Sequence, residues 1–301
     1  MDLAPDFSFQ PLPPIEEPAA LAPAADPLGP LAGLAGTWSG QGFNVIWRPN
    51  HAPDQDRFLE LNLTSEVLQF TVIPGKIPNR GLLQPDMNMR GLTYLQQISD
   101  ANLHAGLHVE PGLWISVPAT KGPRETPTVA RLASIPHGTT ILAQGTAATS
   151  AAAPVIPDIT IKPFPIGKPG SRIDFPEQNL STPSNFRTAG AGLTGITQHM
   201  VNNPATVLRS AVGQHIVSTT ALHVATKDAA APGGGTANTA FLHGAADGPN
   251  ADAADMRATF WLETRQGDSA PAQLQYAQIV MLNFNGLSWP HVTVATLTKT
   301  A

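Results

Sequence analysis

His291 is the residue of this chain whose setting most clearly suggests chemistry. It lies in the closing segment 287–299, which is rich in β-branched residues and is typical of a β-strand. Side chains alternate across a strand, so His291 shares a face with Thr293, Ala295 and Leu297 rather than with charged neighbours. A neutral imidazole among small and apolar groups is suited to be the axial ligand of a haem iron. The alternative is a core histidine whose ring nitrogens are bonded to the backbone.

Other histidines offer further chemistry. His108 and Glu110 would share one strand face, where they could serve in catalysis, bind a metal or form an ordinary hydrogen-bonded pair. His104 and His108 are spaced for a metal pair on a helix, but the residues around them favour a turn. His137 lies in a Pro-His-Gly turn and is either a solvated loop residue or a polar group over the distal face of a haem.

Composition excludes several classes of function. The chain has no cysteine, which rules out disulfides, thiolate metal sites and iron–sulfur clusters. The net charge is −5 and the 17 lysines and arginines are scattered, so we expect no nucleic-acid partner. No segment resembles a signal peptide or a membrane helix, and the expected location is cytoplasmic.

Short strand-like segments recur along most of the chain. They are expected at about 37–47, 58–70, 91–98, 112–117, 129–134, 138–146, 215–226, 236–243, 256–264, 273–284 and 291–299. Such a series predicts an all-β protein, an antiparallel β-barrel of about ten strands whose closure removes exposed edges.

Two regions depart from this pattern. Residues 1–30 are rich in proline and alanine and predict an extended arm, which leaves 31–301 as a single barrel domain. Residues 150–235 predict a large insertion of loops, with a helix near 195–212 in which Pro204 marks a kink or a second start. We expect the insertion to pack on the outside of the barrel or over its mouth.

Three separated motifs carry a resemblance to a known family. The first is G-x-W-x-G-x-G, formed by Gly36, Trp38, Gly40 and Gly42; the second is the Leu-His-Val-Glu-Pro-Gly run at 107–112, followed by the Pro-His-Gly turn at 136–138. The third comprises 274–276, 285–287 and the strand 291–297. Together they resemble the nitrobindin family of haem-binding, lipocalin-like β-barrels. His137 stands where that family has threonine, and the arginine that often follows the mid-barrel glycine is absent.

The resemblance implies haem b as cofactor, with His291 as the iron ligand and Gly36, Trp38, Gly40 and Gly42 in the binding motif. It also implies nitric oxide binding and peroxynitrite isomerisation, with peroxidase-like chemistry as a variant. The expected partner is a small molecule or a diatomic ligand, and a homodimer is left open. Two other classes compete: a non-catalytic carrier of an apolar small molecule, and an interaction module with the barrel as scaffold.

Overall fold

The structure, a computed structural model, describes residues 3–5, 7–9, 26–53, 55–120, 126, 128–212, 215–229, 232–245 and 248–300. Most of the predicted arm at 1–30 lies outside these residues, and the prediction of one domain over 31–301 stays a prediction. Among the described helices none has the length and apolar character needed to span a bilayer.

The described part of the chain is predominantly β-structure. Its strands are β1 (Gly36–Pro49), β2 (Arg57–Val72), β3 (Ile77–Asn79), β4 (Met87–Asp100), β5 (Gly106–Val117), β6 (Thr128–Ile135), β7 (Thr139–Ser150), β8 (Phe164–Pro165), β9 (Ile216–Ala225), β10 (Gly235–Asn238), β11 (Asp252–Arg265), β12 (Gln273–Phe284) and β13 (Leu287–Lys299). Its helices are short: α1 (Gln198–Asn202), α2 (Ala205–Ala211) and α3 (Ala240–His243), with 3₁₀ turns η1 (Gly29–Leu34), η2 (Pro176–Gln178) and η3 (Gly190–Leu193).

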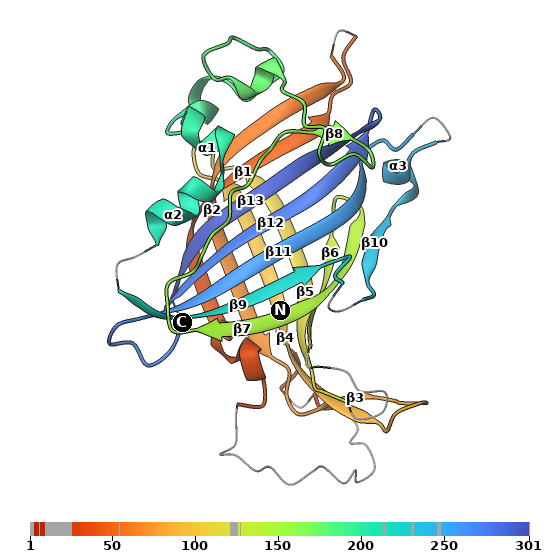
Figure 1. Ribbon diagram of the computed structural model, residues 1–301, viewed down its shortest axis with the longest axis vertical. Coiled ribbons are helices and arrows are strands. Elements are labelled where there is room, and N and C mark those ends of the chain that lie inside the picture. The colour runs from red at the N-terminus through yellow and green to blue at the C-terminus, as the bar shows by residue number, and fades with distance from the viewer. Residues whose placement is uncertain are drawn as a thin grey trace.

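Ten antiparallel strands close into a barrel, which confirms the predicted fold (Figure 1). Their order is β1-β2-β4-β5-β6-β7-β9-β11-β12-β13, and β13 pairs back onto β1 over Trp38–Ile46 and His291–Lys299. The short strands β3, β8 and β10 pair with β4, β13 and β7 respectively. The strand predicted at 236–243 is wrong in its second half, where the chain turns into α3. The helix predicted near 195–212 is interrupted at Pro204, which begins α2 as a second start.

The barrel interior is a core of alternate inward-facing side chains. At one end η1 closes the lumen with Leu31 and Leu34, which are fully buried, and the indole Nε1 of Trp38 donates to the Leu34 carbonyl at 2.7 Å. We call this the η1 end. The core also contains Leu68, Phe70, Leu92, Tyr94, Trp114, Ile141, Leu222, Val224, Met256, Phe260, Leu262, Leu274, Tyr276, Ala295 and Leu297.

Two glycines of β1 explain how closely this strand approaches β13. A Cβ atom on Gly40 would lie 2.2 Å from the Thr296 carbonyl oxygen, and one on Gly42 would lie 2.3 Å from the Val294 oxygen. Both positions therefore require glycine for the pairing that closes the barrel.

A second apolar cluster lies on the outer wall of the barrel. Outward-facing residues of β1, β2 and β11–β13 pack there against the excursion, which we define as residues 151–212 (Figure 1). Trp47 shows the contact: its Nε1 donates to the Ile161 carbonyl at 2.9 Å. Other members are Phe43, Val45, Leu59, Leu61, Ile156, Ile159, Ile196, Val201, Leu208, Trp289, Val292 and Val294. Residues 151–212 of the predicted insertion thus cover the outside of the barrel, whereas residues 216–225, which the prediction of 150–235 included, form the barrel strand β9.

One carboxyl group is buried in this outer contact. Glu263 of β11 is fully buried; its Oε2 accepts from Gln273 Nε2 at 2.6 Å, and its Oε1 has no partner among the described residues. Gln273 also donates to the Ala211 carbonyl of α2 at 3.4 Å. Burial raises the pKa of Glu263 to about 7, and the hydrogen bond from Gln273 and the charge of Arg265 offset this only in part.

Stability should therefore fall with pH at this site. Folding raises the pKa of Glu263, so the protonated carboxyl group stabilises the folded state. This contribution to the free energy of unfolding is complete below the ordinary pKa near 4.5 and is lost as the pH rises through about 7. We expect Glu263→Gln to be more stable than the parent at pH 8, by on the order of 2 kcal/mol, and nearly equal at pH 5. Urea midpoints at the two pH values measure this, with Glu60→Gln as the control for loss of a carboxylate. A gain that is equal at both pH values would contradict it.

Candidate functional site at the histidine end of the barrel

The barrel end opposite η1 gathers the polar residues that could do chemistry. Because the strands are antiparallel, β13 begins at the same end as the β4–β5 turn and the β6–β7 turn. His291 lies near the start of β13, His108 near the start of β5, and His137 in the β6–β7 turn. We call this the histidine end.

His291 faces the lumen, as the alternation of β13 predicted. Ala295 and Leu297, on the same face, belong to the inner core, and the register places Ile46 of β1 and Val280 of β12 beside His291. Neither ring nitrogen of His291 has a hydrogen-bond partner in the described part of the chain, so the satisfied-core alternative is not what the structure shows. Burial, with smaller contributions from the charges of His108 and His137, lowers its pKa to about 3. The imidazole is therefore neutral at physiological pH.

His108 and His137 form a pair on the far side of the lumen from β13. Their ring centroids are 5.8 Å apart, with the planes tilted by 34°. In the strand order, β5 and β6 stand four and five places from β13, which puts them across the barrel. All three imidazoles thus lie at the histidine end, with His108 and His137 on the wall opposite His291.

A buried ion pair lies directly beneath His108. His108 Nε2 is 3.3 Å from Glu110 Oε2, while the other oxygen of Glu110 accepts from Arg131 Nη2 at 2.5 Å and from the Tyr94 hydroxyl. Arg131 also donates to the Tyr94 oxygen at 2.9 Å and to Gln278 Oε1 at 2.6 Å. Burial alone would raise the pKa of Glu110, but the charge of Arg131 and these hydrogen bonds outweigh it and hold the pKa at about 2.

A second carboxyl group deeper in the lumen has the opposite setting. Glu66 of β2 accepts from the Tyr276 hydroxyl at 2.5 Å, from Thr64 at 2.8 Å and from Gln96 at 3.4 Å. Burial raises its pKa despite these hydrogen bonds. The two environments therefore shift the pKa values in opposite directions: Glu110 is favoured as the anion and Glu66 as the protonated acid.

The sequence indicated the pair of His108 and Glu110 but not the rest of these buried polar networks, which we call the polar layer. Glu110 and Arg131 lie on different strands and are 21 residues apart in the sequence. The signal that could have revealed these residues is the side-chain alternation of each strand. Glu66 shares a strand face with Leu68 and Phe70, and Arg131 shares one with Ala133, so both charged side chains face the core. Arg131 supplies from β6 a guanidinium that the sequence analysis had reported absent from the mid-barrel segment.

The glycine and tryptophan motif of β1 lies away from His291. Trp38 pairs with Lys299, eight residues along β13 from His291, and belongs to the η1 end. Gly36 begins β1 at that end, while Gly40 and Gly42 lie between. The structure therefore does not bring the four motif residues together with His291, and their contact with a cofactor stays a prediction.

Metal binding by the histidines alone has no support in the geometry. Within the described ranges no group of three or more His, Cys, Asp or Glu side chains is arranged to hold a metal ion. His104 has a positive φ of 56° in the β4–β5 turn, so it and His108 do not share a helix face. The four-residue spacing of His104 and His108 therefore does not place the two imidazoles on a common helix face, because His104 lies in a turn and His108 on a strand.

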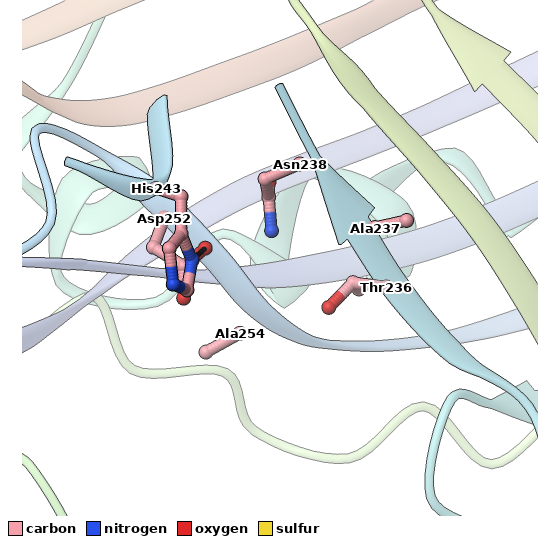
Figure 2. Close-up of a pocket in the computed structure, with 6 residues that line it drawn as sticks. All are labelled: Thr236, Ala237, Asn238, His243, Asp252 and Ala254. Atoms are coloured by element: carbon pink, nitrogen blue, oxygen red, sulfur yellow. Dashed lines mark hydrogen bonds and ion pairs between the residues drawn. The ribbon is translucent and has the colours of Figure 1, made fainter. Parts of the chain in front are cut away.

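A separate hollow of about 500 Å³ lies beside the histidine end (Figure 2). Its lining comes from β10, α3 and β11 and includes Asn238, His243 and Asp252, with His243 Nδ1 3.4 Å from Asp252 Oδ1. Ala253 belongs to the inner core, so its neighbours Asp252 and Ala254 face outward. The hollow is therefore distinct from the lumen that His291 faces.

His291 has the properties that a haem iron requires of a protein ligand. Iron requires a neutral imidazole with a free nitrogen, and His291 meets both conditions. Ile46 and Val280 flank it with apolar side chains. The lumen beneath is occupied by the Glu110–Arg131 and Glu66–Tyr276 networks, so a porphyrin would have to bind at the end of the barrel.

Comparison with known proteins adds little to this description. No family model matches the chain, and no curated protein matches it. Among solved structures it is similar to the crystal structure of Rv2717c from M. tuberculosis, with 13% identity, a TM-score of 0.43, and coverage of 92% of this chain and 99% of that chain.

Proposed function

We propose that the chain binds one haem b at the histidine end of the barrel, with His291 as the iron ligand. The observation that carries the proposal is the lumen-facing imidazole of His291, which is neutral and has no described hydrogen-bond partner. The side chain is partly exposed, and no described residue bonds either ring nitrogen, so a nitrogen is free to bind iron.

The opposite wall supports a binding site for a second, small ligand. When bound, haem supplies an iron that takes NO, peroxide or peroxynitrite. His137, which is exposed, and His108, whose side chain is 16% exposed, stand across the lumen as polar groups on the distal side. The assignment of His137 as a distal residue, and of an isomerase or peroxidase-like activity, belongs to this proposal.

The side of the haem opposite His291 is expected to be open. His108 is held by Glu110 and His137 lies in an exposed turn, so neither is fixed as a second iron ligand. Protein reconstituted with haemin should bind cyanide in the ferric state and NO in the ferrous state, followed by their absorption spectra. A low-spin bis-histidine spectrum that is lost in His137→Ala would contradict an open site, although it would keep His291 as a ligand.

A carrier of an apolar small molecule is the second candidate function. The apolar flank of Ile46 and Val280 beside His291 favours it, because such a surface binds aliphatic or aromatic groups with no metal. The two functions differ in their dependence on the imidazole. Binding of an apolar fluorescent probe that survives His291→Ala, in a protein that does not retain haemin, would favour the carrier.

A further inference from the structure

The environment of His108 fixes the imidazole in one orientation. His108 Nε2 lies 3.3 Å from Glu110 Oε2, and Glu110 is completely buried. The other oxygen of that carboxylate is taken by Arg131 and Tyr94, so His108 is the group that bonds Oε2. The His108 side chain itself is 16% exposed, which leaves it accessible from the lumen.

The carboxylate also selects one tautomer of the imidazole. Glu110 beside Arg131 is an anion with no proton to donate, so the hydrogen atom between the two residues must be on His108 Nε2. In the neutral ring, Nδ1 then carries a lone pair and no proton. No hydrogen bond to Nδ1 is present among the described residues.

The charged and titratable groups that surround His108 are few. Glu110 lies on its own strand β5, Arg131 on β6, His137 in the β6–β7 turn, and Glu66 on β2 interacts with it electrostatically. His291 faces it from β13. The pair formed by His108 and Glu110 therefore leaves Nδ1 without a bonded partner among the described residues, on the wall opposite His291.

We propose that His108, oriented by Glu110, is the acid–base residue of the site, which takes the proton of a protic ligand bound between it and His291. The ligand class is a small acid of the form HX, such as a hydroperoxide or hydrogen cyanide. The H–X bond breaks, the proton passes to His108 Nδ1, the electron pair stays on X⁻, and the Glu110 carboxylate balances the imidazolium that forms. On release of the ligand the proton returns. The inference rests on the proposed haem site.

Comparing the association rates of cyanide and NO distinguishes an effect on proton transfer from an effect on ligand access to the site. Hydrogen cyanide must lose a proton to bind as the anion, whereas NO carries none. In haemin-reconstituted protein at neutral pH, His108→Gln should slow cyanide association by about 10²-fold, which is the usual contribution of a positioned base. NO association with the ferrous protein should change little. His104→Gln is the matched control, because it removes an exposed imidazole of the adjacent β4–β5 turn that lies outside the proposed site, and it should leave the cyanide rate close to that of the parent.

The tautomer gives a second readout that needs no haem. Nitrogen-15 NMR of the haem-free protein should show His108 as the Nε2–H form, with Nδ1 unprotonated. An Nδ1–H form, an unchanged cyanide rate in His108→Gln, an equal slowing of cyanide in His104→Gln, or equal slowing of cyanide and NO in His108→Gln would each overturn the inference. These results differ from failure of the proposed function, in which the parent takes up no haemin and the inference falls with it.

Discussion

His291→Ala is expected to abolish haem binding and leave a folded barrel. The substitution removes the imidazole that we propose as the iron ligand, and no other described residue of this face replaces it. The cost to the fold should be small, about 1 kcal/mol, because His291 has no described hydrogen bond and is only partly buried. Haemin titration followed at the Soret band measures the first effect, and far-ultraviolet circular dichroism measures the second.

Two controls make this test specific to His291. His108→Ala and His137→Ala remove the imidazoles on the opposite wall and should still take up haemin. If all three variants lose haemin equally, the effect belongs to the shape of the lumen rather than to a ligand bond. An unchanged titration in His291→Ala would remove His291 as the iron ligand.

Deletion of residues 155–190 is expected to unfold or aggregate the protein. The deletion exposes the outer wall around Trp47 and Trp289, and it removes the buried side chains of Ile156, Ile159, Ile161 and Phe164 from their contacts. Each such side chain is worth about 1.5–3 kcal/mol, so the sum approaches the total stability of a typical domain, about 5–15 kcal/mol.

The loss of stability in the deletion variant should appear as protein in the insoluble fraction, or as a thermal unfolding transition far below that of the parent. The control replaces the exposed turn 168–171 by Gly-Ser residues, a change that leaves the outer cluster intact and should leave the transition near that of the parent. A soluble, cooperatively folding protein after the larger deletion would show that the excursion is dispensable. The sequence predicts that the insertion packs on the outside of the barrel or over its mouth, but it does not reveal the apolar outer wall that the insertion buries.

The barrel could be predicted from the sequence because its signals are local. Short segments with β-branched residues, separated by turn signals, are sufficient to indicate many antiparallel strands, and closure follows from the cost of open edges. The alternation in β13 likewise predicted that His291, Ala295 and Leu297 share one strand face, and the structure shows that this face meets the lumen. The boundary at Pro204 followed from the absence of a backbone donor in proline.

The second apolar cluster on the outer wall and the polar layer in the lumen could not be predicted in the same way. In β13 the residues Val292, Val294 and Ala295 are all buried, because one face meets the lumen and the other the excursion, and a doubly buried strand has no polar face to reveal its orientation. The pairing of Glu110 with Arg131 depends on the register of β5 with β6. That register brings together residues that have no sequence relation of their own.

Titration of haemin into the metal-free parent protein tests the central claim most directly. The account predicts saturation at about one haemin per chain, a shifted Soret band, and an iron–histidine signature in the resonance Raman spectrum that disappears in His291→Ala. Binding without saturation, or a saturated complex whose iron–histidine signature persists in His291→Ala, would contradict it.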